Sequence, residues 1–217
     1  MYRTLLQEVC RELRFRSATL NSTDMSQVLW SLAALEYADP ELLGLLKSRL
    51  AEMWDDLSPH DSAVTVWGLA TLGFDTWDLL LRLEARVAAG AVEGMNAASA
   101  SLLLSGLVKS AALRFSDSLQ LPQQGGSSGG GTLHSLLRVL SNELMEQVDQ
   151  ASLIDISRLC QAWTRLRYPA TEQDLARLAA RCQQLMQVES DLARSDPKLD
   201  RREFSSARLL PCHELRL

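Results

Sequence analysis

Apolar residues recur along the chain at helical spacing, and one run of them occurs twice. Residues 28–37 read VLWSLAALEY and residues 65–74 read TVWGLATLGF, so that Trp30 returns as Trp67, 37 residues later. Apolar residues spaced by three and four predict amphipathic helices, and an interval of about 20 to 50 residues is typical of stacked-repeat proteins. The pattern therefore predicts helical repeats.

Helix-start signals extend this period to four copies. The segments NSTD, SPHD, NAAS and SLID each open on a side chain that can cap a helix, at Asn21, Ser58, Asn96 and Ser152. Such a side chain accepts a hydrogen bond from a backbone N–H of the first turn, and an acid three residues later faces the positive end of the helix dipole. We therefore expect repeats to start near residues 21, 58, 96 and 152.

Each predicted first helix is followed by a second, Leu-rich helical stretch. These stretches begin near Pro40, Thr76, Leu133 and Thr171. A helical hairpin of about 37–38 residues is the repeat, and the predicted fold is all-α, an α-solenoid of stacked hairpins over residues 1–188. Residues 3–15 are expected to be the second helix of a partial repeat whose first helix lies outside this sequence.

Two segments interrupt or follow the array. The interval from the third to the fourth start is longer than the others because of a low-complexity insertion, residues 116–132, which ends in GGSSGGGT. We expect a flexible linker there, since the segment lacks the GK[ST] ending and the preceding strand of a phosphate-binding loop. Residues 189–217 are charged and without a period, and are expected to be either a disordered tail or a truncated repeat.

Comparison of the four copies separates packing positions from variable ones. One column of the first helix stays apolar, with Leu32, Leu69, Leu107 and Trp163, and another stays small, with Ser31, Gly68, Gly106 and Ala162. The apolar column predicts a buried stripe between hairpins. Glycine weakens a helix interior by about 0.5–1 kcal/mol relative to alanine, so the small column predicts close approach of neighbouring helices.

Three other columns change their chemistry from copy to copy. They read Gln27, Val64, Leu102, Arg158; then Trp30, Trp67, Ser105, Gln161; and then Ala34, Thr71, Lys109, Arg165. Spacings of three and seven residues place the columns on one helical face. That face is either where a ligand is recognised repeat by repeat or a solvent-facing surface without function. The two tryptophans are either core residues or platforms on which bases stack.

The repeated unit resembles a known family. A capped helix of the form LLWALAxLG[YF], a short Pro-containing turn and a Leu-rich second helix are found best in residues 28–37 and 65–74, and more weakly in 96–111 and 152–168. Over most of residues 3–188 the chain resembles the octotricopeptide repeat, and it is similar to the heptatricopeptide and FAST-kinase-like repeats of RAP-domain proteins. The turn motif of that family is only hinted at here, and no RAP domain follows the array.

The resemblance implies a place and a task for the protein. It implies an α-solenoid in a chloroplast or mitochondrion that binds organellar RNA and governs its stability, processing or translation. Helical RNA readers of this kind recognise about one base per repeat with two or three side chains.

Composition narrows the possibilities further. Apolar residues make up 47% of the chain and aromatic residues only 6%, a balance that suits helices better than strands. No apolar run approaches the roughly 18 residues of a membrane span. Residues 1–15 mix arginine with glutamate and lack an apolar segment, so no targeting peptide is predicted. Four scattered cysteines without a CxxC pair predict thiols in a reducing compartment.

No motif predicts catalysis, a metal or a cofactor. The three histidines, His60, His134 and His213, have no second ligand at metal-binding spacing, and the pair Asp55 and Asp56 is expected to be a solvated run beside a turn. No nucleophile elbow, kinase loop or dinucleotide fingerprint is present. We therefore expect a protein that is not an enzyme.

Two functions follow from these patterns. The first is binding of single-stranded RNA, through the candidate contacts Gln27, Lys109, Arg114, Arg158, Gln161, Arg165 and Arg167. The second is a non-catalytic protein-interaction scaffold of the armadillo/HEAT-like class, because the net charge is −5 and the acidic excess falls in residues 22–95, where a basic partner would bind. The resemblance favours the first and the charge favours the second.

Overall fold

The computed structural model describes residues 2–90, 95–115 and 128–195. These residues form α-helices joined by short turns, and no strand occurs among them. The helices are α1 (Tyr2–Arg16), α2 (Ser22–Ala34), α3 (Pro40–Glu52), α4 (Pro59–Thr71), α5 (Trp77–Ala88), α6 (Ala97–Phe115), α7 (Ser128–Glu146), α8 (Leu153–Arg165) and α9 (Glu172–Ser195). The predicted all-α class is confirmed.

Two predicted boundaries differ from the structure. α7 begins at Ser128, so residues 128–132 of the expected linker are the first residues of a helix, while residues 116–127 lie outside the described part. α9 continues to Ser195, past the expected boundary at 188, and the remainder of the expected tail, residues 196–217, lies outside the described part.

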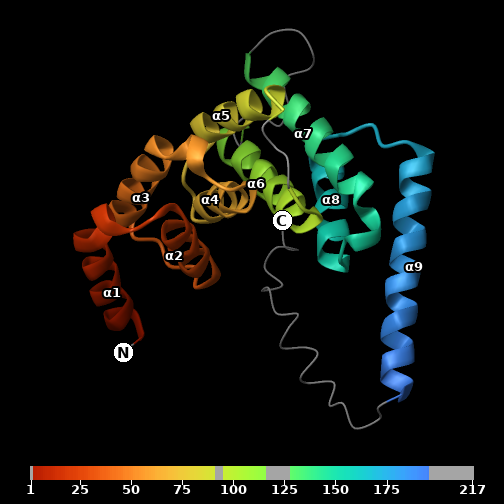
Figure 1. Ribbon diagram of the computed structural model, residues 1–217, viewed down its shortest axis with the longest axis horizontal. Helices are drawn as coiled ribbons and strands as arrows, with labels where there is room; N and C mark the ends of the chain where they lie inside the picture. Colours follow the sequence, from red (N-terminus) through yellow and green to blue (C-terminus); the bar gives the residue numbers. More distant parts are fainter. Residues whose placement is uncertain (1, 91–94, 116–127, 196–217) are drawn as a thin grey trace. The chain divides into compact units, whose positions relative to one another are not determined.

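The chain divides into two compact units, residues 1–171 and residues 172–217. In the first unit, α2 packs on α4, α4 on α6 and α6 on α8, while α1 packs on α3 and α5 on α7. Figure 1 shows these helices in sequence order within that unit. The helices α2, α4, α6 and α8 are called the first helices below, and α1, α3, α5 and α7 the second helices. In the second unit, the described part is the single helix α9.

All four predicted helix starts are confirmed. The side chains of Asn21, Ser58, Asn96 and Ser152 accept a hydrogen bond from the backbone N–H three residues later, at 2.8, 3.0, 2.8 and 3.3 Å respectively. A one-turn 3-10 helix precedes α2, α4 and α8, at Ser17–Thr19, Trp54–Asp56 and Val148–Gln150. The first helices are therefore entered by closely similar local geometry.

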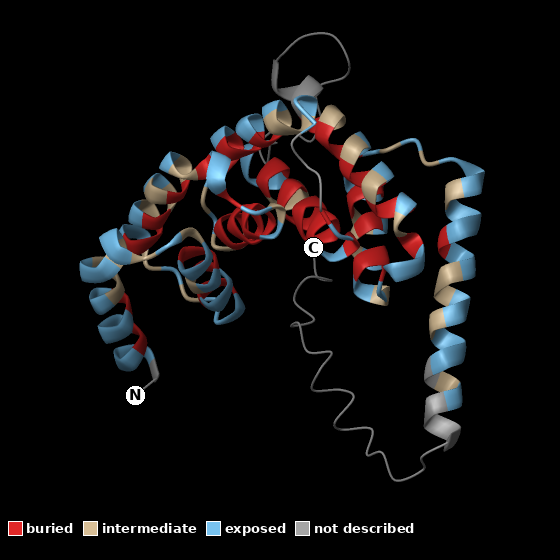
Figure 2. Ribbon diagram, viewed as in Figure 1, coloured by how far each residue is buried: buried red, intermediate tan, exposed pale blue. Residues whose placement is uncertain are grey.

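The core follows the predicted apolar column. Leu32, Leu69, Leu107 and Trp163 are at most 5% exposed, and Figure 2 shows buried residues on the sides of the helices that face their neighbours. A buried leucine stabilises a fold by about 1.5–3 kcal/mol relative to an exposed one, so this column contributes strongly to the packing of the first unit.

The small column marks close helix contacts, as predicted. A Cβ atom added at Gly106 of α6 would lie 3.0 Å from Val66 Cγ1 and 3.1 Å from the backbone nitrogen of Trp67, both in α4. A Cβ atom at Gly68 would lie 3.3 Å from the Cβ of Leu29 in α2. Since the nearest atoms at Gly106 include backbone, the glycine there permits an approach that a larger side chain would block.

Hydroxyl–carboxylate contacts join the first turns of neighbouring first helices. The hydroxyl of Ser26 in α2 donates to the buried Asp61 of α4 at 2.7 Å, and that of Ser101 in α6 donates to the buried Asp155 of α8 at 2.5 Å. Between α4 and α6 the carboxylate is replaced by Ser99, which contacts His60 Nδ1 at 3.2 Å. Because the first two turns of each of these helices meet the first turn of the next, the four first helices run in parallel.

Candidate nucleic-acid interface

The three columns of the first helices that change from copy to copy, called the variable stripe below, are not exposed along their whole length. At its first two positions the residues of α4 and α6 are buried: Val64, Trp67, Leu102 and Ser105 are at most 8% exposed. At these positions of the two middle copies, both interpretations from the sequence, a ligand-reading face and a solvent-facing surface, are therefore wrong. Their side chains vary because each fills a different space between helices. Trp67 is a core residue, whereas Trp30 in α2 is 49% exposed.

Three candidate contacts lie at the two ends of this row. Gln27 is exposed on α2, while Arg158 and Gln161 are half-buried on α8. Arg158 Nη1 donates to the hydroxyl of Ser101 at 3.4 Å, beside the contact between Ser101 and Asp155. Arg158 therefore has a structural role between α6 and α8, and Gln27 lies at the far end of the row of first helices.

The other four candidates gather at one edge of the first unit. Lys109 and Arg114 lie in the last two turns of α6, Arg165 is the last residue of α8, and Arg167 follows in the turn. Because α6 and α8 pack side by side in parallel, these residues share the edge at which both helices end. We call Lys109, Arg114, Arg165 and Arg167 the C-terminal edge. Arg114, Arg165 and Arg167 are exposed, and Lys109 is half-buried.

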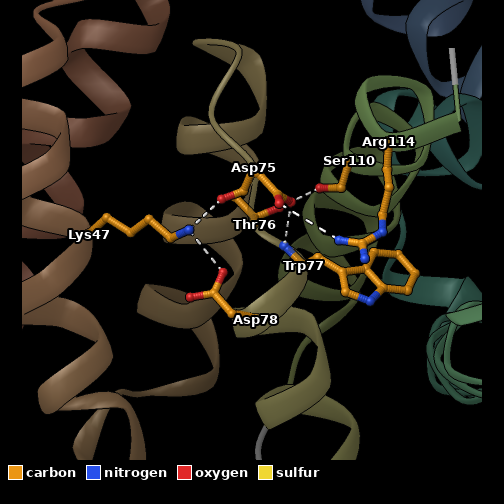
Figure 3. Close-up of polar contacts among 7 residues, drawn as sticks. All are labelled: Lys47, Asp75, Thr76, Trp77, Asp78, Ser110 and Arg114. Atoms are coloured by element: carbon orange, nitrogen blue, oxygen red, sulfur yellow. Dashed lines mark hydrogen bonds and ion pairs between the residues drawn. The ribbon is translucent and has the colours of Figure 1, made fainter. Parts of the chain in front are cut away.

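Arg114 is held in place by the turn that precedes α5 (Figure 3). Its guanidinium carbon lies 4.9 Å from the ring centroid of Trp77, and Nη1 lies 3.7 Å from a carboxylate oxygen of Asp75. A guanidinium over an indole face gains about 0.5–2 kcal/mol from the cation–π interaction. The side chain of Arg114 is 45% exposed, so its outer face still reaches solvent.

The same turn is anchored from its other side. Lys47 Nζ donates to the backbone oxygen of Asp75 at 2.6 Å and pairs with the Asp78 carboxylate at 2.9 Å, and the hydroxyls of Thr76 and Ser110 lie 2.5 Å apart. Figure 3 shows these contacts converging on residues 75–78 from α3 and α6. The turn therefore links three successive repeats and holds the residues that position the Arg114 side chain.

Several cations that sequence reasoning overlooked have structural roles. Arg86 of α5 donates to the backbone oxygens of Trp54 and Leu57 at 2.9 and 3.1 Å, and Arg49 of α3 donates to that of Ala18 at 3.3 Å. These arginines are 37 residues apart, so the repeat period itself was a signal that could have identified them. They satisfy loop carbonyls that would otherwise lack a donor.

The helix dipole explains why cations are favoured at the C-terminal edge. Cations near the end of a helix are stabilised by its dipole by about 0.3–1 kcal/mol, and the acids Asp24, Asp61 and Asp155 in the first turns are favoured for the same reason. The positions of α2 and α4 that correspond to Lys109 and Arg165 hold Ala34 and Thr71. In this column, basic residues therefore occur only in the third and fourth repeats.

Other chemistry is sparse in the described part of the chain. Burial raises the pKa of the Cys10 thiol, the Asp39 carboxylate raises it further, and Arg14 partly opposes both. Among the described residues, no three His, Cys, Asp or Glu side chains are grouped as ligands for a metal ion. No described helix is both long and apolar enough to cross a membrane.

Comparisons with known proteins give no relative. No protein-family model matches the chain, and no curated protein or solved structure is significantly similar to it.

Proposed function

We propose that this protein is an α-solenoid without catalytic activity that binds single-stranded RNA through its C-terminal edge. The order in which the first helices pack, their parallel direction and their four equivalent caps support a solenoid. The resemblance of its repeats to the octotricopeptide family supports RNA as the ligand and organellar RNA stability, processing or translation as the task.

The observation that carries this proposal is the grouping of Lys109, Arg114, Arg165 and Arg167 at one edge. Neighbouring cations on adjacent helices provide contacts for successive phosphates of a flexible strand, and phosphate contacts supply most sequence-independent affinity. The arginines can also stack on bases or bind phosphate with two hydrogen bonds. Gln161, half-buried on α8 beside this edge, is the amide best placed to recognise a base.

The proposal predicts weak, salt-dependent binding. For single strands the logarithm of the binding constant falls with the logarithm of salt concentration by about 0.7 for each phosphate contacted. Four cations therefore predict a slope of about −3 at most. We expect a short labelled RNA of mixed sequence to bind at low salt and to dissociate at physiological salt, as measured by fluorescence anisotropy.

A double variant tests the site directly. Replacing Lys109 and Arg165 by alanine should weaken RNA binding and reduce the salt slope to about half, because two of four contacts are lost. The matched control replaces Arg3 and Arg138, two exposed arginines of the second helices, and changes the net charge equally. Binding that survives in the first variant, or is lost equally in the control, would exclude the C-terminal edge.

A protein-interaction scaffold is the second candidate. The observation that favours it is the exposure of large apolar residues on α1, where Leu5 is 62% and Phe15 79% exposed. Val9 of the same helix is 44% exposed, and contiguous apolar surface of this kind can serve as an interaction site. A protein partner that stays bound after ribonuclease treatment, together with no retention of the chain on RNA, would favour this function over the first.

A further inference from the structure

The turn after α8 carries a stack of two aromatic rings. Tyr168 lies over Trp163 with the ring centroids 5.4 Å apart and the ring planes 18° from parallel. Trp163 is 5% exposed, and its indole N–H donates to the hydroxyl of Ser141 in α7 at 2.8 Å, so this ring is fixed in the core. Tyr168 is only half-buried although Trp163 covers one face of its ring, so solvent reaches it from the other side. The stack therefore presents a tyrosine ring on a rigid support.

The backbone of this turn occurs at the end of three of the first helices. In each copy an N–H group donates to the carbonyl oxygen five residues earlier, at 3.0, 2.9 and 2.9 Å: Tyr37 to Leu32, Phe74 to Leu69 and Tyr168 to Trp163. This hydrogen bond is typical of the Schellman motif, in which an apolar residue at this position packs on the end of the helix. The motif explains an apolar residue at position 168, and a leucine there would also satisfy it.

Among these three copies, the fourth repeat alone places cations on both sides of the aromatic ring. Arg165 and Arg167 are both exposed. The equivalent residues are Ala34 and Glu36 in the first repeat, and Thr71 and Gly73 in the second. A planar ring beside two guanidinium groups matches a nucleotide in a strand, because the base is planar and the phosphates on either side of it are anionic.

Arg167 adopts a backbone conformation that favours glycine. Its φ is 52°, in the left-handed region, and the equivalent residue of the second repeat is Gly73, with φ of 81°. A residue with a Cβ atom is disfavoured in this region, and such residues are often found at functional sites. Glu36, with φ of 49°, holds the same position in the first repeat, so the turn itself does not require a cation. A role in binding would explain why the arginine is present.

We propose that Tyr168 is a stacking platform for one unpaired base of the RNA, and that Arg165 and Arg167 bind the phosphates on either side of that base. This inference rests on the proposed function and assigns the residue that distinguishes a single strand from a duplex. The bases of a duplex are already stacked on their neighbours, so a duplex is bound mainly through its backbone. The cations alone would accept many polyanions, whereas the ring adds a preference for a strand with free bases.

The test compares three nucleic acids on the full chain at low salt. The probes are a single-stranded RNA, a strand of equal length without bases, and a duplex RNA of the same sequence, each with the same fluorescent label for anisotropy. The strand without bases keeps the phosphates and removes the groups that would stack. We expect the single-stranded RNA to bind at least about fivefold more tightly than this strand, which is the smallest effect of one base stacked on an aromatic ring.

Substitutions of Tyr168 test the ring itself. Tyr168→Leu should weaken binding of single-stranded RNA by at least about fivefold and leave the salt slope unchanged, because a base contact is lost and no phosphate contact is lost. Binding of the duplex and of the strand without bases should not change. Tyr168→Phe keeps the ring and should bind as the original chain does. The matched control is Tyr37→Leu, which alters the same turn where no arginines flank it and should not affect binding.

A substitution of Arg167 separates binding from folding. Glycine is preferred in the left-handed region, so Arg167→Gly should keep or raise the melting temperature. It should nevertheless weaken RNA binding and make the salt slope shallower by about 0.7, the value for one phosphate contact. Glu36→Gly is the matched control, which relieves the same backbone position and should not weaken binding. A lower melting temperature in Arg167→Gly would instead indicate a structural role for the arginine.

The possible failures of this inference differ from those of the proposed function. RNA binding that is unchanged in Tyr168→Leu, or weakened equally in Tyr37→Leu, would overturn the platform while RNA binding by the chain stands. If Tyr168→Leu melts at a lower temperature, the comparison with the strand without bases decides, because it uses the unchanged protein. Equal binding of that strand and of RNA would also overturn the platform. No binding of any of the three probes at low salt would overturn both proposals.

Discussion

At the scale of single residues, the parallel row of first helices depends on a few buried polar contacts. Asp61 accepts hydrogen bonds from the hydroxyls of Ser26, at 2.7 Å, and of its own cap Ser58, also at 2.7 Å. Each partner satisfies a different carboxylate oxygen. A buried carboxylate is tolerated only when its oxygens accept hydrogen bonds. A first helix with such an aspartate can therefore pack only on a neighbour that supplies a donor.

Removing one of these donors should be costly. We expect Ser26→Ala to lower the free energy of unfolding by about 1–3 kcal/mol, because Asp61 stays buried with one donor fewer. Urea denaturation measures the change. The matched control is Ser157→Ala, the equivalent position of α8, where the residue is exposed and an effect within about 0.5 kcal/mol is expected. Equal effects of the two substitutions would contradict a structural role for the buried contact.

The thiols of Cys10 and Cys160 should differ sharply in reactivity. Cys10 is fully buried with a raised pKa, whereas Cys160 is exposed on α8. The thiolate is the reactive form, so we expect iodoacetamide at about pH 8 to modify Cys160 at least about tenfold faster than Cys10. Site-resolved mass spectrometry measures both rates. Comparable rates in the folded protein would show that α1 opens readily from α3.

The raised pKa of Cys10 also makes the stability of the folded protein fall at alkaline pH. Burial favours the protonated thiol in the folded state, and the unfolded thiol ionises near its ordinary pKa of 9.0. The contribution of Cys10 is therefore fully present below that pH and is lost as the pH rises through the folded-state pKa. We expect Cys10→Ala to flatten the fall in melting temperature between neutral and alkaline pH.

At the scale of helices, glycine positions distinguish close contact from open surface. We expect Gly106→Ala to destabilise the protein by about 1–2 kcal/mol, because the added Cβ would lie 3.0–3.2 Å from Val66 and the backbone of Trp67. Gly44→Ala on α3 is the matched control, since a Cβ there meets nothing within 4 Å. Alanine at Gly44 should stabilise by up to about 1 kcal/mol through helix propensity alone. The same sign for both substitutions would contradict the close packing of α4 and α6.

The helices themselves follow closely from the sequence. Caps such as Asn21 and Ser152 act within one turn, so a four-residue pattern was enough to locate them. Burial of the variable stripe was not predictable in this way, because whether Val64 or Leu102 is covered depends on the neighbouring helix. The early start of α7 at Ser128 was also missed, because a glycine-rich segment has low intrinsic helix propensity.

The candidate site was predictable only in part. Arg165 and Lys109 were identified by their place in a repeated column, and the structure places both at helix ends on one edge. The role of Arg158 was not visible in the sequence. Its hydrogen-bond partner Ser101 is 57 residues away along the chain, and the burial of Asp155, which Ser101 also contacts, depends on the fold. The contact of Arg114 with Trp77 likewise joins two repeats and required the fold.

At the scale of the whole molecule, charge and apolar surface are separated along the first unit. The C-terminal edge of α6 and α8 is basic, whereas the exposed Leu5 and Val9 lie on α1. In a stacked array each repeat contacts mainly its neighbours, so the two surfaces are coupled only through the repeats between them. We therefore expect Val9→Glu to leave RNA binding unchanged, which anisotropy with labelled RNA would measure. A loss of RNA binding in that variant would show that the ends of the unit are not independent.

The division of the chain at residue 171 gives the broadest test. The proposed RNA-binding edge belongs to residues 1–171, and that unit contains the core column and all four caps. We expect a chain that ends at Thr171 to keep its melting temperature within about 2 °C, which corresponds to less than about 1 kcal/mol for a protein of this size. It should also bind RNA as the full chain does. A much lower melting temperature would show that residues 172–217 contribute to folding of the repeats, and loss of RNA binding alone would place part of the site in the second unit.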